Sequence, residues 1–266
     1  MSLLLSPEGL SALDAVVKLR PLLAFDFDGT LAPIVPHPDS AAVPPLLAEQ
    51  LRALATHLPV AIVTGRAVAD VLPRLGFEPH YVVGNHGSEE PGVPLAPDAA
   101  AALDSLRQQI AGQAQALDDA GVLIEDKHHS FTLHHRLATD QVRAVTSIEQ
   151  VLVGLDPALR RFGGKFVVNV VAAQARDKGD AVVSLVERSK AGAALFIGDD
   201  VNDESVFECA APHWVTVRIG RDDPSSKARF FLDEHAEVTQ VLARLLSALE
   251  AGTPSAGQAD EPSEKL

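Results

Sequence analysis

Short apolar runs that each end at a glycine, threonine or aspartate recur along the chain. Such runs are typical of strands buried inside a parallel sheet. They cover residues 22–27, 60–63, 81–83, 194–197 and 214–219. Between the first two runs, residues 44–58 place leucines on one helical face behind two prolines, which predicts a helix and with it a βαβ unit. We therefore predict an α/β fold with a doubly wound, Rossmann-like parallel sheet, in which ligands gather beyond the carboxyl ends of the strands.

The middle of the chain has a different pattern, which predicts an inserted α/β domain. A proline-rich break precedes a long helical stretch, and alternating segments follow. The break covers residues 89–97, the helical stretch 98–120, the antiparallel strands 122–126, 130–136 and 165–171, and a further helix 140–155. We expect a discontinuous core domain, 1–88 and 176–250, with the insert at 89–175. Residues 251–266 hold almost nothing to bury and are expected to be a disordered tail.

Composition and charge narrow the partners that this chain can have. A length of 266 residues suggests about two domains. A formal charge of −14 disfavours nucleic acid and anionic membranes as partners. No apolar run is long enough for a membrane helix, and the N-terminus lacks the features of a signal peptide. The single cysteine, Cys209, excludes an internal disulfide and is expected to pack in the core. We therefore expect a cytoplasmic protein, as a monomer or weak homo-oligomer.

Acidic residues follow two of the predicted strands. Asp26 and Asp28 lie two positions apart at the end of the first run, and Asp199, Asp200 and Asp203 form a cluster after a later one. A doubly wound sheet brings both groups to the same edge. Oxygen ligands alone favour a hard ion such as Mg²⁺. Taken by itself, Asp-x-Asp-Gly fits a strand-end turn with solvated acids equally well, so the second cluster is what points to a metal site.

Four segments, in the same order, resemble the motifs of phosphotransferases of the haloacid dehalogenase (HAD) superfamily. They are Phe25–Leu31, Thr64-Gly65-Arg66, Lys178-Gly179 and Gly198–Asp203. The resemblance implies that Asp26 attacks phosphorus to form an aspartyl-phosphate, while Asp28 protonates the leaving oxygen and later activates water. It also implies that Thr64 and Lys178 hold the phosphoryl oxygens. Taken alone, Thr64 could equally cap the helix that follows.

The same resemblance implies a set of Mg²⁺ ligands. These are the side chains of Asp26 and Asp199 and the main-chain carbonyl of Asp28, with Asp200 or Asp203 acting through water or as support. The negative charge of these carboxylates far exceeds the positive charge of the one lysine in the motifs. A phosphate dianion therefore needs the cation in order to enter the site.

Further segments resemble those of the trehalose-6-phosphate phosphatase family. They are Gly84–Gly87, Glu125–Lys127, His134–Arg136, Gly164-Lys165 and Asp177–Gly179, within a match over most of residues 22–210. The resemblance implies hydrolysis of trehalose 6-phosphate, a small-molecule sugar phosphate. The insert then corresponds to the α/β cap of the sugar-phosphatase branch, which covers the active site and selects the leaving group, and we expect its hinges at 91–97 and 174–177. The candidate substrate contacts are Arg66, Asn85, His86, Glu125, Lys127, Arg136, Lys165 and Asn169.

One strand of the insert departs from the family pattern. Where the family has a glutamate, followed two positions later by a basic residue and a proline, this chain has Asn169, Val171 and Ala172. Asparagine can still donate and accept hydrogen bonds, so sugar binding is retained while the identity of the sugar stays open. Sucrose phosphate and mannosylphosphoglycerate are the alternative substrates. A phosphomutase and an inactive sugar-phosphate-binding module are weaker alternatives, since the acids that the motifs require are present.

Overall fold

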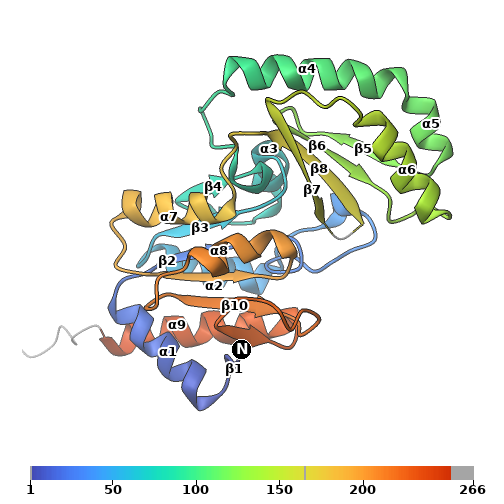
Figure 1. The fold of residues 1–266 in the computed structure, drawn as a ribbon. Helices are drawn as coiled ribbons and strands as arrows, with labels where there is room; N and C mark the ends of the chain where they lie inside the picture. The colour runs from blue at the N-terminus through green and yellow to red at the C-terminus, as the bar shows by residue number, and fades with distance from the viewer. Residues whose placement is uncertain (1, 165, 253–266) are drawn as a thin grey trace, which may run out of the picture.

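The computed structural model describes residues 2–164 and 166–252 and contains two sheets, the larger one below the smaller one in Figure 1. The larger sheet is parallel, with the strand order β1-β11-β10-β9-β2-β3-β4. Its strands are β1 (Ser2–Leu3), β2 (Leu22–Phe25), β3 (Val60–Val63), β4 (Tyr81–Val83), β9 (Ala194–Gly198), β10 (Val215–Ile219) and β11 (Phe230–Leu232). Strand β2 lies between β3 and β9, where the order of connection reverses. Ligands of doubly wound sheets bind at such a point.

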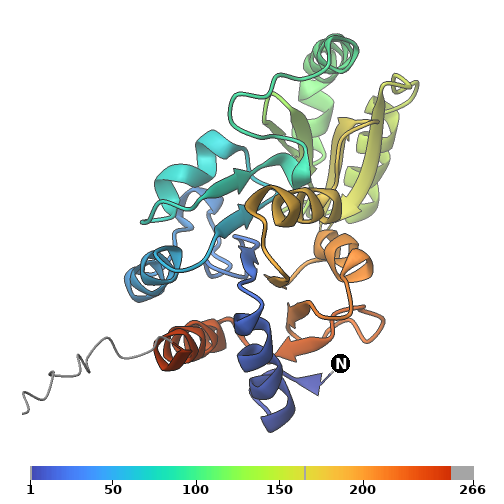
Figure 2. The same cartoon turned by 90° about the vertical axis from the view of Figure 1, so that its left-hand side faces the viewer.

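Helices cover both faces of this sheet. On one face α9 (Val238–Gly252) packs against both α1 (Pro7–Lys18) and α2 (Pro45–Ala55), and on the other lie α7 (Lys178–Ser189) and α8 (Glu204–Cys209) (Figure 2). The short helix α3 (Val68–Val71) follows β3. Helix α2 forms as its sequence predicts, because Pro45 begins it and the leucines at 47, 51 and 54 are buried along one face.

The smaller sheet is antiparallel, with the order β5-β6-β8-β7. Its strands are β5 (Leu123–Asp126), β6 (Ser130–His134), β7 (Leu159–Gly164) and β8 (Val167–Ala172), and its helices are α4 (Pro97–Gly112), α5 (Ala114–Asp119) and α6 (Gln141–Val151). Along β6, Phe131 and Leu133 join the apolar cluster formed with these helices. The alternate residues Ser130 and Thr132 therefore face the other way, and this face of the sheet lies toward the larger one (Figure 1).

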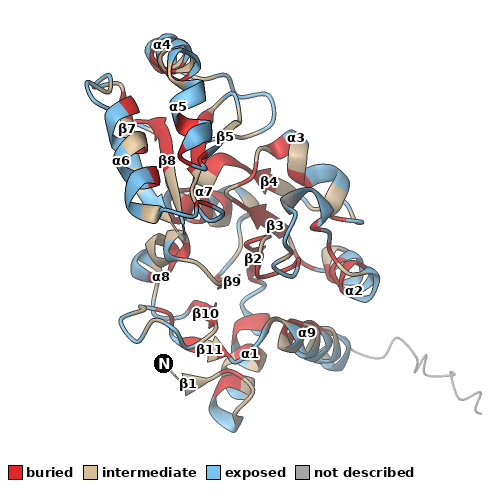
Figure 3. Ribbon diagram, turned by 90° about the vertical axis from the view of Figure 1, so that its right-hand side faces the viewer, coloured by how far each residue is buried: buried red, intermediate tan, exposed pale blue. Residues whose placement is uncertain are grey.

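Each sheet has a hydrophobic core of its own. One cluster joins buried apolar side chains from residues 4–83 and 181–245, and the other joins those from residues 102–170. Figure 3 shows buried residues following the strands of both sheets. The domain boundaries that we place at 88/89 and 175/176 fall between the two clusters and stay a prediction.

The sequence pattern did not predict β1, α1, β11 and α9 of the core, and three of the predicted segments differ in the structure. The helix expected over 98–120 is two helices, α4 and α5, which meet at Gln113. The strand expected over 165–171 has a partner, β7, which precedes it in a hairpin; the burial of β7 alternates, so it lacks the apolar run that marks the other strands. Helix α9 includes residues 251 and 252, so the expected tail begins in a helix, and residues 253–266 lie outside the described residues.

Two expectations based on composition can also be compared with the structure. Cys209 is exposed, so the prediction that it packs in the core is wrong; it is the last residue of the short helix α8, at the surface. Within residues 2–164 and 166–252, no helix is both long enough and apolar enough to cross a membrane.

Candidate active site

The carboxyl ends of β9, β2 and β3 hold the polar residues of the motifs. Asp26 follows β2, Thr64 follows β3 and Asp199 follows β9. The main-chain amide of Asp26 donates to the carbonyl of Ile197 on β9 at 3.0 Å, which fixes the end of β2. Gly29 has a φ of +77°, and a Cβ atom at this position would lie 2.2 Å from Asp199 Oδ2. Glycine is favoured here because of this backbone conformation, and a larger residue would also displace the Asp199 carboxylate.

Three carboxylates converge at this edge of the sheet. One oxygen from each of Asp26, Asp199 and Asp203 lies within 4.8 Å of the other two. Burial raises the pKa of Asp26 to about 7, although the charge of Lys178 acts in the opposite direction. Burial and, to a smaller extent, repulsion from Asp26 raise the pKa of Asp199 to about 8. Closely spaced carboxylate oxygens are the ligands that a hard divalent cation prefers, so the residues present fit Mg²⁺.

Lys178 balances part of this negative charge. Its Nζ donates to Asp26 Oδ1 and to Asp203 Oδ1, both at 2.7 Å. Burial alone would lower the pKa of this lysine, but the two carboxylates raise it above its ordinary value, so the ammonium is charged. Lys178 is the first residue of α7, and Asp177 caps the helix through a capping box. The cap fixes the point from which the lysine reaches the carboxylates.

Asp203 and Asp200 differ in what they bind. Asp203 is fully buried, and its Oδ2 accepts from the amides of Asp199 at 2.9 Å and of Asp200 at 3.0 Å. Since the lysine occupies Oδ1, both oxygens of Asp203 have protein partners, and this residue shapes the loop that presents Asp199. Asp200 accepts from its neighbours in the same turn and is not among the three converging carboxylates. Of the aspartates expected to bind metal, the structure therefore brings Asp26, Asp199 and Asp203 together through their side chains.

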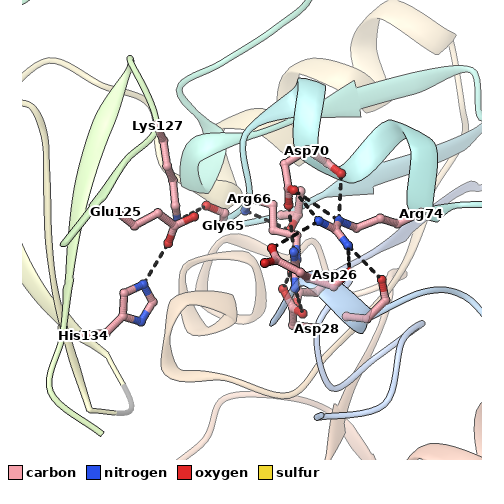
Figure 4. A network of polar contacts seen from close by, with 12 residues as sticks. Asp26, Asp28, Gly65, Arg66, Asp70, Arg74, Glu125, Lys127 and His134 are labelled. Atoms are coloured by element: carbon pink, nitrogen blue, oxygen red, sulfur yellow. Dashed lines mark hydrogen bonds and ion pairs between the residues drawn. The ribbon is translucent and has the colours of Figure 1, made fainter. Parts of the chain in front are cut away.

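The carboxylate of Asp28 pairs with Arg66 (Figure 4). Arg66 Nε donates to Asp28 Oδ2 and Nη2 donates to Oδ1, each at 2.8 Å. Nη1 of the same guanidinium donates to Asp70 Oδ2 at 2.7 Å, and Asp70 Oδ1 accepts from Arg74 Nη2 at 2.6 Å. The structure thus places Arg66, which was expected to contact substrate, against the residue expected to act as acid and base.

Thr64 is fully buried at the start of the turn that carries Arg66. Its Oγ1 accepts from the Arg66 amide at 3.1 Å, and its own amide donates to the carbonyl of Val83 on β4 at 2.9 Å. The hydroxyl oxygen therefore shapes the turn, while its O–H is the group that could donate to a phosphoryl oxygen.

Side chains of the smaller sheet face the same turn (Figure 4). Lys127 Nζ donates to the carbonyl of Gly65 at 2.8 Å and lies 3.6 Å from Glu125 Oε2, which in turn lies 2.8 Å from His134 Nε2. Burial lowers the pKa of Lys127. Burial alone would raise the pKa of Glu125, but the hydrogen bond with His134 and the charge of Lys127 lower it. Glu125 and Lys127, both expected to contact substrate, thus lie opposite the carboxyl ends of the parallel strands.

Asn85 and His86 follow β4 in a tight turn, with φ of +47° and +59°. Asn85 is fully buried, and both polar atoms of its side chain have hydrogen-bond partners. Its Nδ2 donates to Glu89 Oε2 at 2.6 Å, and its Oδ1 accepts from the hydroxyl of Ser130 on β6. Asn85 therefore connects the two sheets, and its side chain is used by the protein itself.

His86 and Asn169 bring buried polar atoms to the junction of the two sheets. Asn169 Oδ1 accepts from Thr132 Oγ1 at 2.8 Å, and the His86 ring packs edge-on against Phe162 with the ring centroids 5.2 Å apart. Within the part of the chain that the structure describes, the ring nitrogens of His86 and Nδ2 of Asn169 have no hydrogen-bond partner. Burial, helped by nearby lysines, holds the pKa of His86 well below its ordinary value, so the ring is neutral. The hydroxyls of a sugar are groups that would satisfy such atoms.

Two expected substrate contacts remain. Arg136 is exposed, and its guanidinium lies 5.9 Å from the centroid of the Phe166 ring. Lys165 lies outside the described residues.

Comparison with protein families decides which one this chain represents. The trehalose-phosphatase model matches residues 24–236. The chain belongs to this family. The trehalose-phosphate phosphatase of Mycobacterium bovis (strain BCG / Pasteur 1173P2) is 34% identical over 268 residues, covering 91% of this chain and 66% of that protein. The protein of the same name from Mycobacterium leprae (strain TN) is 35% identical over 269 residues, covering 91% and 62%. The chain thus spans slightly less than two thirds of the length of these relatives.

Solved structures share the fold of this trehalose-phosphatase family member. The C-terminal domain of trehalose-6-phosphate phosphatase from C. albicans has a TM-score of 0.75 at 21% identity, over 89% of this chain and 96% of that one. A haloacid dehalogenase-like hydrolase from Bacteroides thetaiotaomicron has a TM-score of 0.61 at 14% identity, over 85% and 99%. The predicted fold, a parallel-sheet HAD core with an inserted α/β cap, is confirmed. We call the smaller sheet with α4, α5 and α6 the cap.

The residues that support this site and that the sequence pattern does not reveal include Asp70, Ser130 and Thr132. Asp70 lies four positions after Arg66 and four before Arg74, a spacing that is typical of ion pairs along a helix. The helix is too short to be recognised from its apolar pattern. Ser130 and Thr132 are ordinary strand residues in the sequence, and only the alternation along β6 could have placed them on the face toward the core.

Proposed function

We propose that this chain hydrolyses trehalose 6-phosphate to trehalose and inorganic phosphate. The observation that carries the proposal is the arrangement around Asp26, a buried carboxylate at the point where the strand order reverses. Lys178 holds one of its oxygens, and the carboxylates of Asp199 and Asp203 converge on it. Membership of the trehalose-phosphatase family and the names of its relatives support the choice of substrate.

The same cluster supports Mg²⁺ as the metal. Asp26, Asp199 and Asp203 bring three carboxylates together, and Lys178 supplies one positive charge, so with all three carboxylates ionised an incoming phosphate dianion would meet a net charge of −2. The side chains of Asp26 and Asp199 and the main-chain carbonyl of Asp28 would hold the ion, with Asp203 supporting the loop. When bound, the ion supplies neutralisation of charge at the phosphoryl oxygens.

Asp26 would act as the nucleophile, through the carboxylate oxygen that Lys178 does not hold. As this oxygen bonds to phosphorus, the bond between phosphorus and the sugar oxygen breaks, and Asp28 gives a proton to the leaving oxygen. Water then attacks the aspartyl-phosphate, Asp28 takes a proton from it, and phosphate leaves as the Asp26 carboxylate is restored. Lys178 and the hydroxyl of Thr64 would hold the phosphoryl oxygens during both steps.

The sugar would lie between the core and the cap. Glu125 and Lys127 face the turn after β3, and the partnerless atoms of His86 and Asn169 lie at the same junction. A site that binds hydroxyls through buried polar atoms rejects analogues that lack one of them, because an atom of the protein is then left unpaired. The single cysteine supports a reducing compartment such as the cytoplasm.

The test is phosphate release by the whole chain from trehalose 6-phosphate, sucrose 6-phosphate, glucose 6-phosphate and mannosylphosphoglycerate, with Mg²⁺ and with a chelator. We expect trehalose 6-phosphate to have the highest kcat/KM, and the chelator to abolish turnover. Asp26→Asn should lose activity by at least ~10⁴-fold, as expected when a nucleophile is removed. Asp118→Asn, an exposed aspartate on a cap helix, is the matched control and should keep wild-type activity.

The outcomes distinguish the alternatives. A higher kcat/KM for another sugar phosphate would retain the chemistry and refute the substrate. Appearance of an isomeric sugar phosphate without free phosphate would indicate a mutase. Labelled phosphate trapped on a peptide that contains Asp26 would support the aspartyl-phosphate, and a label on any other residue would refute it.

A further inference from the structure

We propose that Arg66 is a positioning residue: it holds the carboxylate of Asp28 in the orientation that proton transfer requires, and Asp70 anchors it from behind. This inference rests on the proposed function, in which Asp28 is the acid and base. It changes the role of Arg66 from a contact with the substrate to a fixed support of the proton carrier.

The guanidinium joins two carboxylates. Nε and Nη2 form two nearly parallel hydrogen bonds to Asp28, each 2.8 Å long, and Nη1 donates to Asp70 at 2.7 Å. All three guanidinium nitrogens therefore donate to carboxylate oxygens. The carbon at its centre also lies 5.1 Å from the centroid of the Phe27 ring. Arg66 is 9% exposed, so ring and carboxylates together fix the plane of the group.

The side chain of Asp28 is less constrained by burial than that of Asp26, so its orientation depends more on hydrogen bonds. The side chain of Asp26 is 7% exposed, whereas that of Asp28 is 42% exposed, at the turn after β2. Among residues 2–164 and 166–252, every hydrogen bond to the Asp28 side chain comes from Arg66. A partly exposed aspartate without these bonds would occupy several rotamers. A bidentate arginine fixes both the rotamer and the plane of the carboxylate.

Asp70 keeps Arg66 in place. It lies on α3, four residues after Arg66, and accepts from Arg66 and from Arg74. Burial would raise the pKa of Asp70, but the hydrogen bonds from Arg74 and Arg66 lower it, so the anchor stays ionised. The position of the guanidinium is thus set by the start of α3 and not by the substrate.

The geometry is compatible with proton transfer. In the proposed first step Asp28 loses a proton to the sugar oxygen, and in the second it gains one from water. In the ionised state both oxygens of Asp28 accept from Arg66, and when one of them carries the proton the other keeps its hydrogen bond, so the carboxyl group stays aligned in both protonation states.

Two substrates with different leaving groups test this role. A sugar alkoxide must be protonated as it leaves, whereas p-nitrophenolate is a weak base that leaves without a proton. We therefore compare kcat/KM, which includes only the steps up to phosphoryl transfer, for trehalose 6-phosphate and p-nitrophenyl phosphate. General acid catalysis contributes about 10²–10⁴-fold. We expect Arg66→Met to lower kcat/KM by at least ~10²-fold for the sugar phosphate and by less than ~10-fold for the aryl phosphate.

Two more variants are compared with Arg66→Met: Arg66→Lys tests the bidentate contact, and Arg221→Met is the matched control. The lysine keeps the charge but cannot form the bidentate contact, so we expect the same difference between substrates as in Arg66→Met. Arg221 follows β10 and forms a similar bidentate pair with Asp233 above the Phe231 ring, and neither residue of this pair belongs to the proposed site. Arg221→Met should leave both kcat/KM values within ~2-fold of wild type, as for surface substitutions that affect no catalytic group.

Equal losses with both substrates would overturn the inference, because they would indicate contact with the phosphoryl group or a general structural defect. Wild-type activity of Arg66→Lys would overturn the need for the bidentate contact. A double-mutant cycle of Arg66→Met and Asp28→Asn, measured by urea unfolding, tests the pair without activity: non-additive changes are expected, and additive ones contradict it. If the wild type does not hydrolyse trehalose 6-phosphate while the cycle shows coupling, the proposed function fails and the pairing stands.

Discussion

Removing one carboxylate from the acidic cluster should stabilise the protein when no metal is bound. In Asp199→Asn the substituted carboxyl is one whose pKa is raised from 3.8 to about 8 by burial and by repulsion from Asp26. One pKa unit corresponds to about 1.4 kcal/mol, so about four units set an upper bound of ~6 kcal/mol on the cost of this charge above about pH 8. Entry of water and sharing of a proton with Asp26 reduce the cost. We expect the free energy of unfolding to rise by ~1–3 kcal/mol at about pH 8.5 in chelator.

The effect of Asp199→Asn on the free energy of unfolding depends on pH. Below about pH 4 the folded and unfolded states both keep the proton, and Asp199→Asn gains nothing. Between about pH 4 and pH 8 the folded state keeps a proton that the unfolded state has released, so the free energy of unfolding of the metal-free wild type falls as pH rises. Saturating Mg²⁺ binds the ionised cluster and should reverse this trend.

The assay is urea unfolding in chelator and in saturating Mg²⁺ over this pH range. The wild type should gain stability from Mg²⁺, whereas Asp199→Asn should gain little. Asp200→Asn is the matched control, because it makes the same change of charge in the same loop outside the three-carboxylate cluster. Repulsion from Asp200 raises the pKa of Asp199 less than burial, Asp26 and Asp203 do, so Asp200→Asn should stabilise the metal-free protein less than Asp199→Asn does, and it should keep most of the gain from Mg²⁺. Destabilisation by Asp199→Asn in chelator, or an unchanged gain from Mg²⁺, would refute the reasoning.

Three further substitutions give separate expectations. Lys127→Met removes the hydrogen bond to the Gly65 carbonyl, which for a charged donor costs about 1–3 kcal/mol. The contact between cap and core should therefore loosen. Small-angle scattering should show a larger radius of gyration, and an unchanged radius contradicts this. Asn169→Asp places a carboxylate at a buried position, where only 2% of the residue is exposed. Burial raises the pKa of such an acid, so the midpoint of urea unfolding should fall at about pH 8 and much less at about pH 5. A pH-independent effect contradicts this. Lys178→Met leaves two carboxylates without their ammonium and should lower the free energy of unfolding by ~3–5 kcal/mol in chelator at about pH 8, measured by urea unfolding; a change below ~1 kcal/mol contradicts the ion pairs.

The catalytic side of the site could be predicted because the topology of the sheet determines it. Asp26 and Asp199 are far apart in the sequence, but each ends a run of buried apolar residues, and β2 and β9 are neighbours in register. Any chain whose strands are parallel brings their carboxyl ends to one edge. The motifs then name the residues, and the structure adds the distances. Lys178 follows the same logic, since a capped helix begins at this edge.

The roles of individual side chains could not be predicted in the same way. Arg66 is a charged residue after a strand, and its sequence neighbours do not reveal that its guanidinium forms two bonds to Asp28 and one to Asp70. Asn85 was expected to face a sugar, but its amide is held between Glu89 and Ser130, and the hydroxyl of Ser130 comes from the other sheet. Contacts of this kind depend on how two separate cores are packed together, and hydrophobic patterning specifies each core without specifying their junction.

Asn169 on β8, where this chain departs from the family pattern, shows why the sugar is the hardest part of the function to predict. From composition, Asn169 is a neutral residue that can donate and accept. In the structure Thr132 donates to its Oδ1, because the two residues face each other across the antiparallel pair of β6 and β8. The side chain therefore offers its N–H groups and one remaining lone pair on Oδ1, so unlike a carboxylate it can donate to an acceptor such as a hydroxyl oxygen. A glutamate at this position, as in the family pattern, would instead present an acceptor to a hydroxyl proton. The register of one strand pair thus changes which partner the same position can bind, and the choice of sugar depends on that register as much as on the residue itself.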